Sequence, residues 1–282
     1  MTPDDLLAVH ELRPGDPRAE SVPFVLLHGF PVDSRMWADV AARLPGERQV
    51  LAIDLPGLGA SAAGTEVARR LRDAGVESAA APALETSADA IWLTLQRRGV
   101  TGAIVVGLSM GAYVAMAILE RHPELVRGLA LLDTRSGPDG ENAAANRLRV
   151  AETVVREDSV DAVRPMATTL LGATSRTARS DLVGRLLGWI DEQRPDGVAW
   201  SQRAMAARPD RSAVLRGFAG PALVLVGDED AVTPVETARV MHGDLAGSTL
   251  VVVLQAGHMT AVESPGPVAD ALGDLAARVD AM

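Results

Sequence analysis

The sequence predicts an α/β fold in which helices cover both faces of a doubly wound, mostly parallel sheet. Six short apolar runs lack polar alternation, which is typical of parallel strands buried on both faces. Helix-like segments lie between most of these runs, as the alternation of strands and helices in such folds requires. The chain has 282 residues, which suits one large domain or two smaller ones.

The predicted strands are, in chain order, residues 24–27, 50–53, 103–106, 129–132, 222–226 and 250–254. Residues 62–85 interrupt the alternation after the second run and predict one helix and a loop. At the end of the chain, apolar side chains recur at helical spacing and predict a helix that packs on the sheet. This stripe consists of Val268, Leu272, Leu275 and Val279.

Residues 102–118 carry no charge, and a window of hydropathy alone would suggest a membrane span. Gly107 and Gly111 bracket a serine in the middle of this stretch. A strand, a tight turn and a helix explain the same residues better, so we expect no membrane span here.

Between residue 133 and Pro221 the chain contains no convincing buried strand. Arg, Ala and acidic residues dominate this stretch, and its apolar residues recur at helix-like spacing. We therefore predict two parts: a core domain of residues 1–133 and 216–282, and an inserted helical cap of residues 134–215 over one end of the sheet.

Composition excludes several functions. The net charge of −10 disfavours nucleic-acid partners and anionic membranes. The sequence contains no Lys and no Cys, which excludes Schiff-base chemistry, a P-loop lysine, a thiol nucleophile and thiolate metal sites. Residues 1–16 are acidic and lack the basic and apolar regions of a signal peptide, so we expect a cytoplasmic protein.

The strongest chemical signal is the segment GLSMG, residues 107–111, which follows a predicted strand and precedes a predicted helix. This is the context of a nucleophile elbow, in which a serine occupies a strained turn. The flanking glycines avoid a backbone clash, and the helix N-terminus faces developing negative charge. Ser109 is therefore the candidate nucleophile.

His258 follows the last predicted strand directly and is the candidate general base. A serine hydroxyl is a poor nucleophile until a base removes its proton, and imidazole is the usual base. Lone histidines are more often structural, and we expect that of the other four histidines.

Three carboxylates follow the strand 222–226, namely Asp228, Glu229 and Asp230. They could form only a solvated turn. The functional interpretation is that one of them fixes the His258 ring and stabilises its imidazolium form. The chain order would then be serine, acid, histidine, with each group at the carboxyl end of a strand.

An oxyanion hole needs two fixed N–H donors beside the nucleophile. Met110, the residue after the serine, supplies one candidate amide. The loop after the first predicted strand supplies the other, and Phe30 is the better donor because Pro31 has no N–H. The alternative is a simple turn at the end of that strand.

These residues resemble landmarks of the α/β-hydrolase fold superfamily. The matching segments, in order along the chain, are residues 28–30 (HGF), 54–61 (DLPGLGAS), 107–111, 227–234 (GDEDAVTP) and 257–258 (GH). The resemblance implies an eight-stranded, mostly parallel sheet with a helical cap after the sixth strand. It also implies that Asp230 is the triad acid, with Asp133 as the reserve candidate.

Within that superfamily the chain resembles serine esterases, enol-lactonases and cofactor-free haloperoxidases. We expect hydrolysis of a small-molecule carboxylic ester or lactone through an acyl-enzyme, without metal or organic cofactor, by a monomer or homodimer. Two alternatives stay open. The same triad could serve acyl transfer, perhydrolysis or carbon–carbon bond hydrolysis, or the protein could bind a small molecule and signal to a partner.

Substrate selection is expected in the cap and in the loops at the carboxyl ends of the strands. Arg135 could meet a carboxylate of an anionic substrate, although such residues are more often surface or ion-pair residues. The candidate pocket walls, each of which could equally be core or cap packing, are Trp37, Met110, Met166, Trp189 and Trp200.

Overall fold

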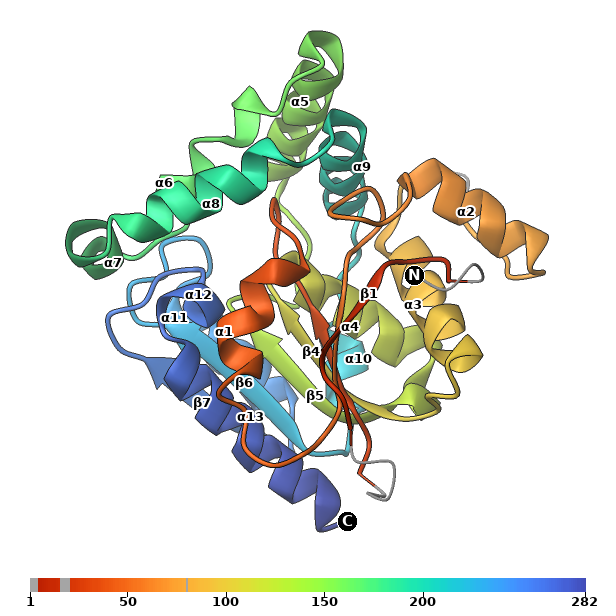
Figure 1. The fold of residues 1–282 in the computed structure, drawn as a ribbon, viewed down its shortest axis with the longest axis vertical. Helices are drawn as coiled ribbons and strands as arrows, with labels where there is room; N and C mark the ends of the chain where they lie inside the picture. The colour runs from red at the N-terminus through yellow and green to blue at the C-terminus, as the bar shows by residue number, and fades with distance from the viewer. Residues whose placement is uncertain (1–4, 16–20, 80) are drawn as a thin grey trace.

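The computed structural model describes residues 5–15, 21–79 and 81–282. The described strands form one sheet in the order β1-β3-β2-β4-β5-β6-β7 (Figure 1). All neighbours pair in parallel except β1, which pairs antiparallel to β3. The strands are β1 (Val9–Arg13), β2 (Phe24–Leu27), β3 (Val50–Ile53), β4 (Ala103–Leu108), β5 (Val126–Leu132), β6 (Ala222–Gly227) and β7 (Ser248–Val253).

All six predicted strands are confirmed, and the seventh described strand is β1, which the apolar pattern missed. Its sequence VHELR is mostly polar and partly exposed, because β1 is an antiparallel edge strand. The expected number of eight strands is not reached in the described part of the chain. Residues 5–8, ahead of β1, are buried but form no strand, and residues 1–4 lie outside the described residues.

One further expectation needs correction. The run at residues 250–254 was expected to be buried on both faces, yet β7 is the other edge of the sheet and most of it is only partly buried. Leu254 lies beyond the strand and is 72% exposed. A continuous apolar run therefore identifies a strand but does not distinguish a central strand from an edge strand.

Helices cover both faces of the sheet. On one face α1 (Ala38–Ala41) contacts α13 (Pro265–Asp280), which carries the predicted apolar stripe against β5, β6 and β7. The other face holds a row of contacting helices, each touching the next. This row consists of α3 (Leu84–Arg97), α4 (Met110–Arg121), α10 (Ser212–Arg216) and α11 (Val235–Asp244). α2 (Gly64–Asp73) and a following loop occupy the predicted short insertion.

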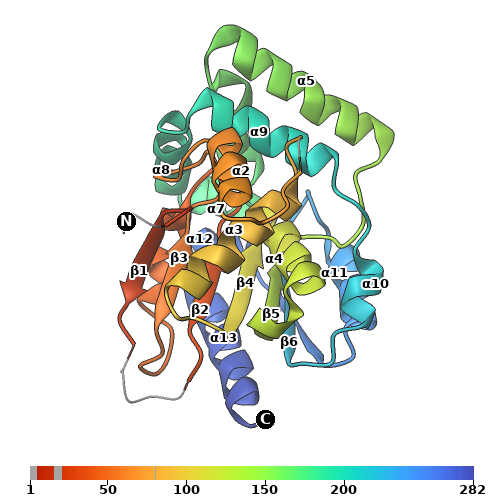
Figure 2. The ribbon, with the colours of Figure 1, turned by 90° about the vertical axis from the view of Figure 1, so that its right-hand side faces the viewer.

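The insertion, defined as the chain between β5 and β6, contains helices and no strand among its described residues. Figures 1 and 2 show its helices stacked over one end of the sheet. They are α5 (Glu141–Glu157), α6 (Met166–Thr169), α7 (Ala173–Ala178), α8 (Asp181–Asp191) and α9 (Pro195–Ala206). The predicted boundary at residue 215 falls within α10, which packs against α4 and α11 of the core.

The order of the strands brings distant loops together. β2 and β4 are parallel neighbours with Leu27 opposite Gly107, so the loops after them begin at the same level. β5, β6 and β7 follow on the other side of β4. In the described part of the chain, every helix is too short or too polar to cross a membrane. The uncharged stretch at residues 102–118 is β4, a turn and α4, as predicted.

Candidate active site

The turn between β4 and α4 places Ser109 at the carboxyl end of the sheet. Ser109 has a φ of 53°, the left-handed region that L-residues seldom adopt. A Cβ at Gly107 would lie closer than 3.0 Å to backbone atoms of Gly111, and a Cβ at Gly111 would similarly crowd the Leu27 carbonyl. Both glycines are therefore required by close backbone approach. The N-terminus of α4 directly follows the serine.

A continuous line of hydrogen bonds leads away from Ser109. Its Oγ lies 2.8 Å from Nε2 of His258, and Nδ1 of His258 lies 2.8 Å from Oδ2 of Asp230. The ionised carboxylate can only accept, so the hydrogen bonds assign the ring proton to Nδ1. Nε2 then accepts from the serine hydroxyl. The structure thus brings together the three residues that the sequence predicted as the triad.

The Asp230 carboxylate is held by more than the histidine. Oδ1 accepts hydrogen bonds from the amides of Val232, at 2.7 Å, and Thr233, at 2.9 Å. The Thr233 hydroxyl donates to Oδ2 at 2.7 Å. Burial alone would raise the pKa of Asp230, but the hydrogen bond and charge of His258, together with Thr233, lower it below the ordinary value. Asp230 is therefore ionised at neutral pH.

The reserve candidate Asp133 also lies at this end of the sheet but does not bond to the histidine. Its Oδ1 accepts from the Gly227 amide at 3.1 Å, and its Oδ2 pairs with the Thr260 hydroxyl at 2.6 Å. The side chain is fully buried, and this burial raises the pKa of Asp133 to about 7. The geometry therefore favours Asp230 as the partner of His258.

The loop after β2 lies beside the serine, as the parallel pairing of β2 with β4 requires. A Cβ built at Gly29 would be 3.8 Å from the Ser109 Cβ. In the described part of the chain, the amides of Phe30 and Met110 donate to no other group. Both predicted donors for an oxyanion thus have no partner among the described residues, and they directly follow Gly29 and Ser109, respectively, in the chain. His28 in the same loop is structural, because its Nε2 accepts from the Leu55 amide.

Two threonines contribute to the site without having been predicted. Thr233 fixes the acid, as described above, and Thr134 donates from its hydroxyl to the Ser109 carbonyl at 3.1 Å. A threonine three residues after an aspartate is a common turn signal, so Thr233 could have been found from the sequence. Thr134 acts across adjacent strands and has no such local signal.

The predicted pocket residues have other contacts. Trp37 is fully buried in the core, within the 3₁₀ helix Ser34–Trp37. Trp200 packs against Gly64 of α2, and Trp189 lies under the Arg185 guanidinium, 4.7 Å from the ring centre. Met166 lines a hollow of about 330 Å³ among the helices of the insertion. Their role as pocket walls remains a prediction.

Arg135 bonds to the loop that carries Asp230. Its Nη2 donates to the Val232 carbonyl at 2.7 Å, in the loop that carries Asp230. Its side chain also lines a hollow of about 380 Å³ with Glu236. Arg135 thus fastens the acid loop to the start of the insertion, and its contact with a substrate remains a prediction.

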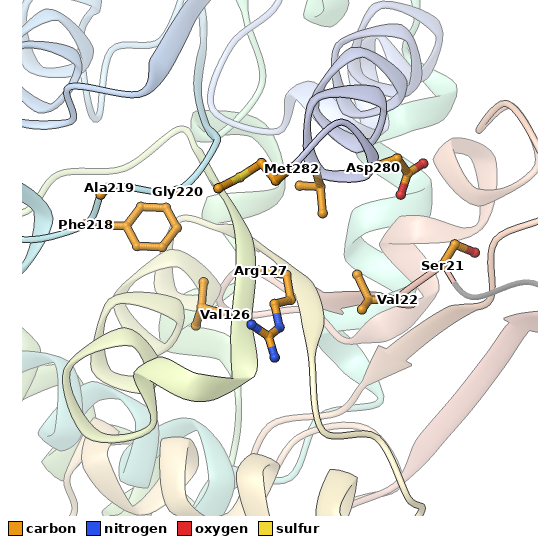
Figure 3. A pocket seen from close by; sticks show the side chains of 10 residues that line it. Ser21, Val22, Val126, Arg127, Phe218, Ala219, Gly220, Asp280 and Met282 are labelled. Atoms are coloured by element: carbon orange, nitrogen blue, oxygen red, sulfur yellow. The ribbon is translucent and has the colours of Figure 1, made fainter.

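Another hollow shows that size alone does not locate the chemistry. A hollow of about 780 Å³, lined by the residues drawn in Figure 3, lies at the amino ends of the strands. Ser109 follows β4 at the opposite, carboxyl end of the sheet. Val126 at the start of β5 and Gly220 before β6 line it, together with the end of α13.

Within the described residues, no group of three or more His, Asp or Glu side chains is arranged to hold a metal ion.

Comparison with known proteins identifies the family. The family model for the alpha/beta hydrolase fold matches residues 22–265. The chain belongs to the α/β-hydrolase fold family. A pimeloyl-[acyl-carrier protein] methyl ester esterase of Neisseria meningitidis serogroup C is 30% identical over 238 residues, which cover 83% of this chain and 85% of that protein.

Solved α/β-hydrolases have the same architecture. A thermophilic esterase from Thermogutta terrifontis, solved with malate bound, superposes with a TM-score of 0.85 at 32% identity, covering 97% of this chain and 93% of that one. The enol-lactonase from Burkholderia xenovorans LB400 gives a TM-score of 0.78 at 20% identity over 95% of this chain and 96% of its own, which shows the fold alone. This α/β-hydrolase is accordingly an enzyme of the hydrolase class.

Proposed function

We propose that this α/β-hydrolase cleaves a carboxylic ester or lactone of a small molecule through a covalent acyl-enzyme on Ser109. The observation that carries this proposal is the line of hydrogen bonds from Ser109 through His258 to Asp230, with 2.8 Å at each step. A serine, a base and an orienting carboxylate in this geometry are the requirements of nucleophilic acyl transfer.

In the first half of the reaction, the Ser109 oxygen attacks the carbonyl carbon while Nε2 of His258 takes the hydroxyl proton. Asp230 stabilises the imidazolium that forms, and it keeps the ring in the orientation that leaves Nε2 free to accept. The tetrahedral intermediate then collapses. The imidazolium returns the proton to the leaving oxygen, and the alcohol departs or, in a lactone, stays attached to the acyl group.

The negative charge of the intermediate lies on the former carbonyl oxygen. The amides of Phe30 and Met110, which have no partner within the described residues, would donate to that oxygen, and the N-terminus of α4 would add the positive end of its dipole. Removal of a single donor in such a site costs about 10²–10³ in rate. The two amides therefore account for a large part of the expected acceleration.

In the second half, His258 removes a proton from a water molecule, which attacks the acyl-enzyme carbonyl. The imidazolium then returns this proton to the Ser109 oxygen as the bond to the acyl group breaks and the acid is released. The ester in the name of the Neisseria relative favours a carboxylic ester as the bond cleaved. We propose that the insertion, over residues 134–215, acts as a cap that shapes the substrate site. Trp189, Trp200 and Met166 would contribute to its walls.

The direct test compares wild type with Ser109→Ala. Both proteins are incubated with a fluorophosphonate probe, and hydrolysis of short-chain p-nitrophenyl esters is followed alongside. We expect labelling and turnover in wild type, and neither in the variant, because the triad acts as a unit. Equal turnover by the folded variant would contradict the proposal, and labelling without any turnover would favour a binding or signalling role.

A further inference from the structure

The insertion touches the loop that carries His258 through backbone atoms. The His258 amide donates to the Leu170 carbonyl at 2.8 Å. Gly172 and Gly257 face each other so closely that a Cβ on either one would come within 3.0 Å of the backbone of the other segment. Residues 170–172 therefore lie directly against the histidine loop.

A buried carboxylate joins the same two segments. Oε1 of Glu263 accepts hydrogen bonds from the amides of Gly257, at 2.9 Å, and Met259, at 3.1 Å, which flank His258 on either side. Oε2 accepts from the Gly172 amide at 2.8 Å. The Glu263 residue is only 2% exposed. Because charge-assisted hydrogen bonds in a dry environment are strong, this carboxylate fixes both loops at once.

A simpler explanation is that Glu263 only caps the short helix α12 (Thr260–Glu263), since a glutamate often reaches back to the amide at a helix start. That role would use the Met259 amide alone. The bonds to Gly257, which precedes the histidine, and to Gly172, which is 91 residues away in the chain, have no part in capping.

We propose that Glu263 is a positioning residue. Together with residues 170–172 of the insertion, it holds the backbone of His258 where the ring can accept the Ser109 proton, and these contacts are called the clamp below. The clamp rests on the proposed function of His258 as the base. This segment of the insertion is then part of the catalytic centre and stays in place during turnover. Substrate contacts made by the insertion are thereby coupled to the position of the base.

The first test is Glu263→Gln, which keeps the size of the side chain but turns one acceptor into a donor that faces backbone amides. We expect kcat for a p-nitrophenyl ester to fall about 10- to 100-fold with KM nearly unchanged, because the base is displaced by less than about 1 Å while the substrate contacts remain. Fluorophosphonate labelling of Ser109 should slow in parallel. A folded variant with the wild-type kcat would overturn the proposal.

Glu192→Gln is the matched control for Glu263→Gln. Glu192 also joins the insertion to the core, through an ion pair with Arg35 at 2.6 Å, but the pair is exposed, and within the described residues neither side chain bonds to the histidine loop. Its removal should leave kcat and KM as in wild type. A loss of kcat in Glu192→Gln as large as in Glu263→Gln would show a general effect of loosening the insertion and would overturn a specific clamp.

The second variant, Gly172→Ala, changes the same contact on the side of the insertion. Its added methyl group would lie 2.5 Å from the Glu229 carboxylate, which bonds to the Thr174 amide, and 2.8 Å from the Gly257 amide nitrogen, so the segment would be displaced from the histidine loop. We expect the same loss of kcat at constant KM. Gly184→Ala is the control, because a Cβ at Gly184 in α8 meets nothing within 4 Å. Wild-type kcat in Gly172→Ala would contradict the clamp.

Hydrogen exchange on wild type tests the clamp without any variant. The amides of Gly172, Gly257 and Met259 should exchange slowly and at similar rates, both in the free protein and after reaction with the phosphonate. Fast exchange at Gly172 would overturn the proposal. If wild type shows no labelling of Ser109, the proposed function fails, whereas the exchange rates still decide whether the clamp exists.

Discussion

The serine loop and the histidine loop meet at one hydrogen bond but are held in different ways. The turn at Ser109 depends on two glycines within five residues, because each lets one backbone pass close to another. The loop at His258 depends on the distant residues Leu170 and Asp230, and on the nearby Glu263, which also bonds to Gly172 of the insertion. The first loop is shaped by the close approach of backbones, including that of β2, and the second is shaped by hydrogen bonds from neighbouring segments.

This difference predicts that the two loops respond differently to amino-acid substitution. A steric requirement is met or not met, so a single methyl group can destroy the serine turn. A network of hydrogen bonds can lose one member and still hold its shape in part. We therefore expect large losses of stability from changes in the serine turn and graded losses of rate from changes around His258.

The largest effect is expected for Gly111→Ala. The added Cβ would collide with the carbonyl groups of Leu27 and His28 in β2 and its following loop, where the backbone of a central strand cannot move away. We expect the free energy of unfolding to fall by about 4 kcal/mol and esterase activity to be lost. Urea unfolding measures the first, and p-nitrophenyl ester hydrolysis measures the second.

Gly184→Ala is the control for this change as well, because its methyl group enters open space on an exposed helix. Replacing a helical glycine with alanine in such a place raises the free energy of unfolding by roughly 0.5–1 kcal/mol. If Gly111→Ala were as stable as Gly184→Ala, the steric account of the serine turn would be wrong.

The same contrast decides what could be predicted from the sequence. The buried strands and the serine turn were predictable, because apolar runs and the GLSMG pattern are each visible within a short stretch of sequence. The position of His258 after a strand was also predictable. The edge strand β1, the contacts of Trp37 and the clamp at Glu263 were not, because each depends on which distant segment packs against it.

The second prediction concerns the buried carboxyl groups around the histidine loop. Burial raises the pKa of Asp133 from 3.8 to about 7, so the folded protein keeps a proton that the unfolded chain loses. Between these values the folded state binds more protons, and rising pH therefore destabilises wild type. Asp133→Asn has no such titration, although it loses hydrogen bonds at every pH.

We therefore expect Asp133→Asn to be less stable than wild type at pH 4, with a gap that narrows by roughly 2–4 kcal/mol on going to pH 8. Urea unfolding of both proteins at several pH values measures the gap. Groups that do not interact with Asp133 titrate alike in the two proteins and cancel in the difference, whereas His258 and Asp230 are electrostatically coupled to it. A gap that is independent of pH would show that Asp133 is ionised throughout.

The smallest effect is expected where the insertion meets the core at the surface. Glu192 is exposed and pairs with Arg35, whose second partner is Asp33. Exposed ion pairs contribute about 0–1 kcal/mol, so Glu192→Gln should change the free energy of unfolding by less than about 1 kcal/mol. A larger change would mean that this surface contact, rather than the buried clamp, fastens the insertion.

The central claim is that His258 joins the two loops into a unit that activates Ser109. The most direct test is the rate of Ser109 phosphonylation in Asp230→Asn, with the labelled residue identified by mass spectrometry and folding checked by urea unfolding. An asparagine amide would donate to Nδ1 and leave the ring proton on Nε2, where it blocks proton transfer from the serine. We predict a fall of about 10³- to 10⁴-fold in the labelling rate. An unchanged rate in the folded variant would contradict the account.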